Sequence, residues 1–319
     1  MALNVVRHQA AGGPTWGVVL GETVAPIEGD FPTTREFMRA GREAAHTVAA
    51  NMSEGPLALA DLDILAPITR ERQFLCQAIN YSSHMRESGF DPKTSPFNVF
   101  FRKASSCIAP ATTPIRKPDH VAFLDYEVEL GLVLSSDVDG PLTVEEKNLH
   151  EYVGAIVLVN DISARDVQLP EMQFYKGKSY RTFGPCGPFL TLVDAEDLAR
   201  FDEFRLTLSV NGEERQNALA KDMIHRPAST LTELSGLQDW EAGDLLATGT
   251  PGGCAMQAPP KPIMAIGQMV SPKTRQGMLR RVASGNERRL EIGDVIEARI
   301  ATDDGEIDLG VQRNEVVPA

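Results

Sequence analysis

Three carboxylates are spaced so that they share one face of an expected β-strand. Side chains alternate across a strand, so Asp125, Glu127 and Glu129 point the same way. The apolar residues 130–134 continue this strand into a core, where neighbouring like charges repel one another. Such a face is tolerated where water solvates it, or where a cation neutralises it. Because every donor is an oxygen atom, the cation would be Mg²⁺, Mn²⁺ or Ca²⁺ rather than zinc.

A further carboxylate follows a second expected strand. Residues 152–159 form a short apolar run that predicts a buried strand, and Asn160 and Asp161 come directly after it. A carboxylate at the end of a buried strand is a common position for a metal ligand or a catalytic acid. The competing interpretation is that Asp161 caps the helix expected after it, and position alone favours the cap.

Five motifs together resemble the fumarylacetoacetate hydrolase family, and they occur in that family's order. They are Asn-Tyr-x-x-His-x-x-Glu at 80–87, Glu-x-Glu at 127–129, Asn-Asp-Ile-Ser-Ala-Arg-Asp-Val-Gln at 160–168, Lys-Gly-Lys-Ser-Tyr-Arg-Thr-Phe-Gly-Pro at 176–185 and Thr-Gly-Thr-Pro-Gly-Gly at 248–253. Each motif is weak alone, and the five in sequence are specific. The resemblance runs from about residue 68 to the C-terminus.

The resemblance implies a metal site made of Glu127, Glu129 and Asp161. Three carboxylates over-neutralise one divalent ion, and they leave coordination positions for waters or for an incoming 2-oxo acid. The ion, Mg²⁺ or else Mn²⁺ or Ca²⁺, would act as a Lewis acid that stabilises an enolate. Asp125 does not match a ligand in most of the family, so we expect it to support the ligands or to lie at the surface.

His84 and Glu87 match the pair that activates water in the family. A helical turn would put them on the same face, and a neutral imidazole oriented by a carboxylate can deprotonate water. A lone histidine near a loop is more often a surface or core residue, but the motif around His84 reverses that interpretation. Lys178 matches a further catalytic position of the family.

Four residues match positions that contact the substrate or support the metal site in the family: Tyr81, Arg165, Gln168 and Thr250. Arg165 and Lys178 would offset a strongly negative pocket and attract an anionic substrate. Two competing interpretations are that Arg165 pairs with Asp166 and that Thr250 belongs to an ordinary turn. Lys103 is a weaker candidate for the same pocket.

The resemblance implies a divalent-metal-dependent hydrolase that cleaves a carbon–carbon bond in an acylpyruvate-like or other β-diketo acid. Water activated by His84 and Glu87 would attack the distal carbonyl, and the metal-bound enolate would leave. The same site would serve an isomerase, tautomerase or decarboxylase of a 2-oxo acid, of the oxaloacetate or 2-hydroxyhepta-2,4-diene-1,7-dioate type. A protein that only binds an anionic metabolite would need the carboxylates but neither His84 nor Glu87.

Composition narrows the class of protein. A formal charge of −13 and a pI near 5.0 argue against nucleic acid as a partner. No apolar run approaches the roughly 20 residues that cross a membrane, and residues 1–11 lack the apolar core of a signal peptide. The four cysteines are scattered, which predicts small buried thiols in a reducing cytoplasm. The family resemblance also implies that the protein is a homodimer.

These residues need a scaffold of turns and short strands. We expect an α+β fold, mainly β, with a small N-terminal α/β accessory domain over residues 1–66 and a mixed β-roll or barrel-like catalytic domain over 67–319. A hairpin turning at Gly21 and a helix that begins at the capping box 33–36 and ends near Ala50 belong to the first domain. In the second, the pattern Glu-x-Gly-Asp at 241–244 and 291–294 predicts two turns that each start a strand.

The chain departs from the family pattern in two places. Tyr180 and Arg181 stand where many members carry an acidic residue after an aromatic one. The segment 255–289 is an extended insert with a proline-rich start and a basic remainder: Lys273, Arg275, Arg280, Arg281, Arg288 and Arg289, against Glu287. It would be a lid or wall for an anionic substrate, a dimer contact, or a solvated loop and helix.

Overall fold

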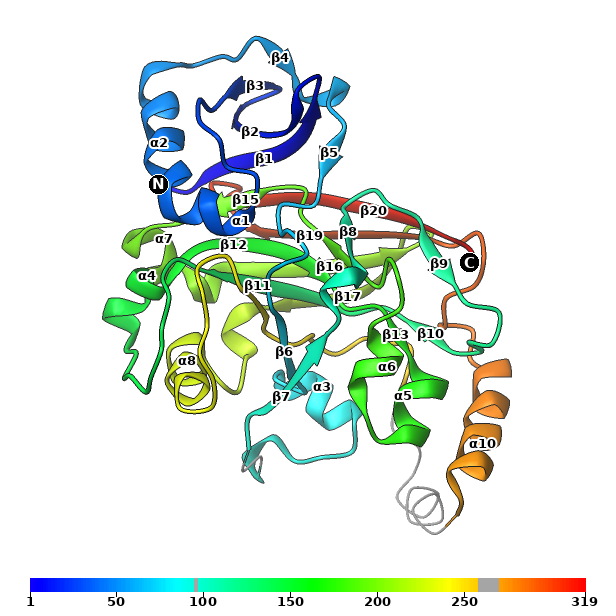
Figure 1. Cartoon of the computed structure of the whole chain (residues 1–319). Helices are drawn as coiled ribbons and strands as arrows, with labels where there is room; N and C mark the ends of the chain where they lie inside the picture. The colour runs from blue at the N-terminus through cyan, green and yellow to red at the C-terminus, as the bar shows by residue number, and fades with distance from the viewer. Residues whose placement is uncertain (95–96, 258–269) are drawn as a thin grey trace.

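The protein, seen here as a computed structural model, combines sheets and helices over residues 1–94, 97–257 and 270–319, which the structure describes. Long strands stack across the middle of the molecule, and most helices of the larger part lie along one side of them (Figure 1). The predicted α+β class is confirmed. The predicted barrel is not: the sheets of the described residues do not close on themselves.

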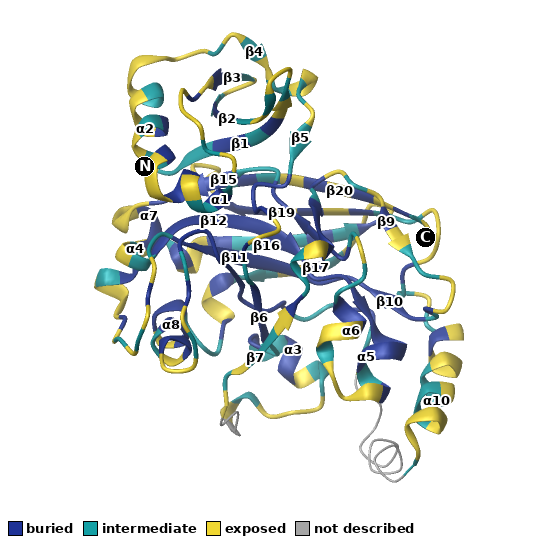
Figure 2. Cartoon of the chain, viewed as in Figure 1, coloured by how far each residue is buried: buried dark blue, intermediate teal, exposed yellow. Residues whose placement is uncertain are grey.

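The larger sheet has 13 strands among the described residues. Its main path runs β4 (Leu57–Ala58), β3 (Thr23–Pro26), β2 (Gly13–Leu20), β1 (Leu3–Ala10), β15 (Leu190–Leu192), β12 (Val153–Asn160), β11 (Val128–Leu134), β18 (Leu245–Ala247), β6 (Phe74–Ala78) and β7 (Val99–Lys103). Three more strands attach beside this path: β5 (Ile64–Leu65), β8 (Ile108–Pro110) and β14 (Gly184–Cys186). The central strands β11 and β12 are wholly buried, as their apolar sequences predict (Figure 2).

Two smaller sheets flank the larger one. The first runs β17 (Glu213–Leu219), β16 (Phe204–Val210), β19 (Val295–Thr302), β20 (Asp308–Pro318) and β9 (Ile115–Lys117). The second joins β10 (Leu124–Asp125) to β13 (Ser163–Ala164). Strand β16 alternates buried and half-buried residues, which is the pattern of a strand with one face on the core.

The helices of the described residues are mostly short: α1 (Thr34–Glu36), α2 (Arg42–Asn51), α3 (Ser82–Glu87), α4 (Leu149–Tyr152), α5 (Arg165–Glu171), α6 (Phe174–Lys178), α7 (Ala195–Ala199), α8 (Pro227–Ser235) and α10 (Pro272–Ser284). Helices α3, α5 and α6 gather beside strands β6 and β7 (Figure 1). Across the described ranges, no helix has the length and apolar character that a membrane span requires.

The N-terminal elements follow the prediction closely. Strands β2 and β3 form the hairpin, with Gly21 in the left-handed region at φ +64°. Thr33 caps the expected helix, which contains a π-helical turn at 37–41 and ends at Asn51. Strand β1 pairs with β15, so the N-terminal strands continue the larger sheet rather than forming a sheet of their own. The boundary at residue 66 stays a prediction.

Both Glu-x-Gly-Asp turns start a strand, as predicted. Gly243 and Gly293 adopt φ values of +86° and +95°, which a residue without a Cβ tolerates. In each turn the aspartate accepts a hydrogen bond from the backbone N–H of the glutamate three residues earlier, at 2.9 Å for Asp244 and 2.7 Å for Asp294. Strands β18 and β19 begin at the next residue.

The strand expected to carry the three carboxylates is interrupted. Asp125 ends β10, which pairs with β13, whereas Val128 begins β11, which pairs with β12. Where β10 gives way to β11, side-chain oxygens take the place of backbone carbonyls as hydrogen-bond acceptors. Asn160 accepts from the backbone N–H of Glu127 at 3.0 Å, and Gln216 accepts from the backbone N–H of Val128 at 3.0 Å. The three carboxylates are buried, so the solvated interpretation of this face is wrong.

The cap of α1 gives a stability prediction. Thr33 Oγ1 accepts from the backbone N–H of Glu36 at 3.2 Å, and the Glu36 carboxylate accepts from that of Thr33 at 3.0 Å. Thr33→Ala should lower the free energy of unfolding by about 1 kcal/mol, because a helix N–H loses its acceptor. Urea denaturation measures this as a lower midpoint. Ser53→Ala removes an exposed hydroxyl beyond the C-terminal end of α2 and should leave the midpoint in place; an equal shift in both variants would argue against the cap.

Candidate active site

Glu127, Glu129 and Asp161 meet at the end of the two central strands. The register that sets Val128 opposite Asn160 brings the three side chains together, and the backbone N–H of Asp161 donates to the carbonyl of Glu127 at 2.8 Å. One carboxylate oxygen of each residue lies within 4.8 Å of those of the other two, and all three side chains are buried. The structure thus brings the predicted ligands into one cluster.

Three buried cationic side chains contact Glu127 or Asp161, and they are Lys103, Lys178 and Arg165. Lys178 Nζ donates to Glu127 at 2.6 Å and also pairs with Asp161. Lys103 pairs with Asp161 and donates to the carbonyl of Phe183 at 2.7 Å. The carboxylate of Asp161 therefore binds lysines, and helix α5 is capped from Ala164 without a side-chain hydrogen bond, so the capping interpretation of Asp161 is wrong.

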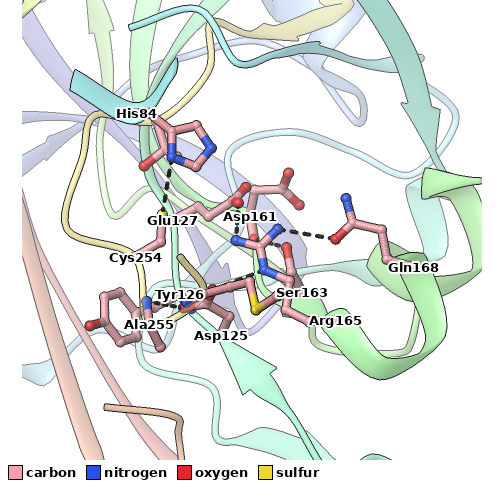
Figure 3. Close-up of polar contacts among 12 residues, drawn as sticks. His84, Asp125, Tyr126, Glu127, Asp161, Ser163, Arg165, Gln168, Cys254 and Ala255 are labelled. Atoms are coloured by element: carbon pink, nitrogen blue, oxygen red, sulfur yellow. Dashed lines mark hydrogen bonds and ion pairs between the residues drawn. The ribbon is translucent and has the colours of Figure 1, made fainter. Parts of the chain in front are cut away.

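Arg165 links the cluster to Asp125. Its guanidinium pairs with Glu127, donates through Nε to Asp125 at 2.9 Å and through Nη1 to Gln168 at 3.0 Å (Figure 3). Burial opposes ionisation of Glu127, but the charges of Arg165 and Lys178 outweigh it and hold the pKa of Glu127 below its ordinary value. Asp166 instead accepts from backbone N–H groups, so the alternative of an Arg165–Asp166 pair is wrong.

Asp125 supports the cluster from beneath. It is fully buried, so the surface alternative is wrong. Besides Arg165, its carboxylate accepts from the backbone N–H groups of Tyr126 at 2.9 Å, Ala255 at 2.8 Å and Met256 at 3.0 Å. It therefore fixes both Arg165 and the chain segment that follows the Gly-Thr-Pro motif.

Glu129 is the carboxylate without a cation among the described residues. Its side chain accepts from the backbone N–H of Gly249 at 3.0 Å. Burial, together with the charges of Asp161 and Glu127, raises the pKa of Glu129 well above its usual range. A divalent cation held by these three carboxylates would remove that repulsion. The donors are all carboxylate oxygens, which fit Mg²⁺, Mn²⁺ or Ca²⁺.

His84 lies next to Glu127, but Glu87 does not touch it. Figure 3 shows the imidazole of His84 above Glu127, and its Nδ1 atom lies 3.9 Å from Sγ of Cys254. Burial lowers the pKa of His84 and favours the neutral imidazole. The Glu87 carboxylate instead accepts from the backbone N–H of Gly253, at 2.9 Å and 3.1 Å for its two oxygens. The expected direct orientation of His84 by Glu87 is therefore absent within the described parts of the chain.

Two of the predicted substrate-binding residues, Tyr81 and Thr250, lie in buried positions. Tyr81 precedes α3 and is fully buried, with a hydroxyl that finds no hydrogen-bond partner among the described residues. Thr250 donates to the carbonyl of Val128 at 2.9 Å and accepts from Gln216 at 2.8 Å. Its hydroxyl thus holds the start of β11. The substrate-binding roles of Tyr81, Arg165, Gln168 and Thr250, and the catalytic role of Lys178, stay predictions.

The described part of the insert packs against the site. Helix α10 lies beside α5, and Arg280 contacts Asp166 at 3.3 Å and the carbonyl of His120 at 2.9 Å. Arg288 donates to the carbonyl of Gly253 at 2.9 Å. These contacts favour a wall over a freely solvated helix. The proline-rich start of the insert lies in 258–269, outside the described residues.

A cavity lies beside one cationic partner of the cluster. It has a volume of about 470 Å³ and is lined by Arg102, Lys103, Ala104, Ser105, Ser106 and Tyr175. Lys103 is the lining residue that pairs with Asp161, and none of the three carboxylates lines the cavity. The sequence placed Lys103 as a weaker candidate for the pocket, and the structure makes it a direct partner of the cluster.

A comparison with protein families decides the relationship. The family model for the fumarylacetoacetate (FAA) hydrolase C-terminal region matches residues 73–317. The chain belongs to the fumarylacetoacetate hydrolase family. The resemblance inferred from the five motifs is confirmed.

Members of the fumarylacetoacetate hydrolase family similar to this chain differ in activity. The mitochondrial oxaloacetate tautomerase fahd2 of Xenopus laevis is 28% identical over 282 residues, covering 85% of this chain and 86% of the relative. A probable 2-hydroxyhepta-2,4-diene-1,7-dioate isomerase from Mycobacterium abscessus has a TM-score of 0.73 at 28% identity, covering 100% and 99% of the two chains. Fumarylacetoacetate hydrolase from Exiguobacterium antarcticum has a TM-score of 0.71 at 26% identity, covering 99% and 100%.

Sequence reasoning did not find Cys254. The four cysteines are free and buried, as predicted, but the Sγ atom of Cys254 lies 3.9 Å from Nδ1 of His84. The available signal was its position directly after the motif at 248–253. A residue that follows a ligand-proximal turn is a candidate for the pocket whatever its type.

Replacing Glu129 and replacing Glu127 should change the free energy of unfolding in opposite directions, because Glu129 has no ion-pair partner among the described residues. Because the pKa of Glu129 in the folded protein lies above its ordinary value of 4.5, the carboxyl costs increasing stability as pH rises from there through its folded pKa. In chelator, Glu129→Gln should raise the free energy of unfolding near neutral pH, because the amide has no charge to bury. Glu127→Gln should lower it by roughly 3–5 kcal/mol, because Arg165 and Lys178 lose a buried partner.

Denaturant titrations in chelator and in saturating Mg²⁺ measure both effects. Magnesium should raise the unfolding midpoint of the parent and leave that of Glu129→Gln unchanged, because the variant lacks a carboxylate ligand. A destabilised Glu129→Gln in chelator would show that Glu129 has a cationic partner of its own.

Proposed function

We propose that this protein is a divalent-metal-dependent hydrolase that cleaves a carbon–carbon bond in an acylpyruvate-like or other β-diketo acid. The observation that carries the proposal is the cluster of Glu127, Glu129 and Asp161 beside a buried, neutral His84. An oxygen-donor metal site and a base adjoining it are what such a cleavage needs. Membership of the fumarylacetoacetate hydrolase family supports the same chemistry.

The chain supplies the groups that bind and orient the substrate. A bound Mg²⁺ or Mn²⁺ would supply Lewis acidity toward the 2-oxo oxygen of the substrate. Lys103, Lys178 and Arg165 set three positive charges against the four buried carboxylates, so a divalent ion would leave the pocket net positive. A small anionic 2-oxo acid is therefore the fitting ligand.

His84 moves the proton. Its Nδ1 faces Cys254, which leaves Nε2 to accept a proton from water. The hydroxide then adds to the distal carbonyl, the carbon–carbon bond breaks, and the electron pair stays on the 2-oxo fragment as an enolate. His84 returns the proton to that carbon, which gives two carbonyl products. A neutral imidazole near pH 7 is the form that this role requires.

A tautomerase, isomerase or decarboxylase of a 2-oxo acid is the second candidate. One observation favours it: the Glu87 carboxylate accepts a hydrogen bond from the backbone N–H of Gly253, and among the described residues no hydrogen bond joins it to His84. A base that only moves a proton between carbon and oxygen needs no such partner. The similarity to the tautomerase fahd2 points the same way.

Three wider predictions from the sequence accompany the proposal. We propose a homodimer, because the family resemblance implies one, and a cytoplasmic location. The acidic composition opposes nucleic acid as a partner. A binding protein without catalytic activity is the least favoured alternative, because it has no use for the buried His84.

The first test is turnover of acetylpyruvate, fumarylpyruvate and oxaloacetate with Mg²⁺, Mn²⁺ or excess chelator. Loss of enol absorbance and product analysis should show metal-dependent formation of two carbonyl products. His84→Gln should lower kcat by about 10²–10⁴-fold with little change in KM, the usual effect of losing a general base. His150→Gln, in α4, serves as the control and should retain the parent's kcat.

The second candidate makes a different prediction for the same panel. Fast, metal-dependent keto–enol exchange of oxaloacetate without cleavage of any compound would replace the hydrolase with a tautomerase. In that case Glu87→Gln should change kcat by less than about tenfold, because its contact is with Gly253 rather than with the base. A hydrolase in which Glu87 acts on His84 in the substrate complex would lose far more.

A further inference from the structure

A second group of potential ligands adjoins the carboxylate cluster. His84, Glu127 and Cys254 each place one ligand atom within 4.8 Å of the other two, and all three residues are buried. Within this group the Cys254 Sγ and His84 Nδ1 atoms are 3.9 Å apart (Figure 3). The donor set of sulfur, nitrogen and oxygen differs in kind from the all-oxygen set of Glu127, Glu129 and Asp161.

The backbone around Cys254 is held from both sides. Before it, Gly252 donates its N–H to Ser83 Oγ at 2.9 Å, and Gly253 donates to Glu87. After it, the backbone N–H of Ala255 donates to Asp125 at 2.8 Å. Cys254 is thus fixed between helix α3 and the carboxylate cluster.

Gly253 makes this turn possible. Its φ of +107° is one that residues with a Cβ rarely adopt, and a Cβ at this position would overlap the carbonyl oxygen of Arg215. The next side chain is consequently directed at His84 rather than at solvent. The thiol itself is fully buried.

The spacing suits a soft, tetrahedral ion. Zinc binds sulfur at about 2.3 Å and imidazole nitrogen at about 2.0–2.1 Å, so a tetrahedral angle places the two donors about 3.6 Å apart. The observed 3.9 Å needs only a small inward shift of the side chains. Glu127 supplies a third ligand, and a fourth position remains for water or an anion. Thiolate and imidazole donors select Zn²⁺ over Mg²⁺.

We propose that Cys254, His84 and Glu127 form a second metal site, for a thiophilic ion such as Zn²⁺. Binding forms one bond from the ion to each residue and releases the thiol proton of Cys254 to solvent. Glu127 belongs to both donor sets, and His84 is the proposed base. Occupation of this site therefore blocks the reaction, and this inhibitory part alone rests on the proposed function.

Cobalt absorption tests the site without reference to activity. The full-length protein, stripped with chelator and given saturating Mg²⁺, is titrated with Co²⁺ while near-ultraviolet thiolate-to-cobalt absorption is recorded. The parent should develop this band at one equivalent, and Cys254→Ala and Cys254→Ser should both lack it. Cys186→Ala removes another buried free thiol, which lies away from His84, and should keep the band. A parent without the band, or a Cys254→Ala variant that retains it, overturns the site.

A zinc titration tests the inhibitory part. With saturating Mg²⁺, micromolar-range Zn²⁺ should suppress turnover by the parent, and Cys254→Ala should need at least about 100-fold more zinc, since losing a direct ligand costs at least as much as losing a supporting residue. Each variant is normalised to its own zinc-free rate. Equal zinc sensitivity in the parent and Cys254→Ala overturns the inhibition. If the protein turns over no compound, the cobalt band still decides whether the site exists, so the two proposals fail separately.

Discussion

The crowding of buried carboxylates at the ends of β11 and β12 is the constraint on which the rest of the structure depends. Two unit charges 4 Å apart repel by about 4 kcal/mol at an effective dielectric of 20, and Glu127, Glu129 and Asp161 lie in one buried cluster that Arg165 connects to the buried Asp125. Arg165, Lys103 and Lys178 offset much of that repulsion. They leave Glu129 without an ion pair among the described residues, and a divalent cation held by the cluster would neutralise its charge.

The same requirement explains several local departures from regular structure. The strand breaks between Asp125 and Val128, and the side chains of Asn160 and Gln216 take over the backbone hydrogen bonds there. This break lets Asp125 turn toward Arg165 while Glu127 and Glu129 stay with the cluster.

Much of this arrangement could be predicted from the sequence, because it rests on local patterns. Apolar runs located β11 and β12, the capping box located the first helix, and glycine turns located β18 and β19. The motifs also singled out the three carboxylates that the structure brings together. Their roles as ligands stay a prediction, as do the domain boundary and the homodimer.

Contacts between distant segments could not be predicted, since spacing along a helix fixes a shared face but not a partner. Glu87 lies three residues after His84, yet its carboxylate binds Gly253. In the same way, nothing local to Arg280 indicates the buried Asp166 on α5. Such partners follow from how loops pack, and loop packing leaves no periodic signal in the sequence.

These long-range contacts make the loop after Thr250 the element that connects helix α3 to the carboxylate cluster. Ser83 and Glu87 attach helix α3 to Gly252 and Gly253, so His84 stands where that loop holds it. Asp125 anchors the other end of the loop and also binds Arg165, which pairs with Glu127. His84 and the carboxylate cluster are thus connected through one short loop. A change in that loop would alter the position of His84 relative to Glu127 without replacing a carboxylate of the cluster.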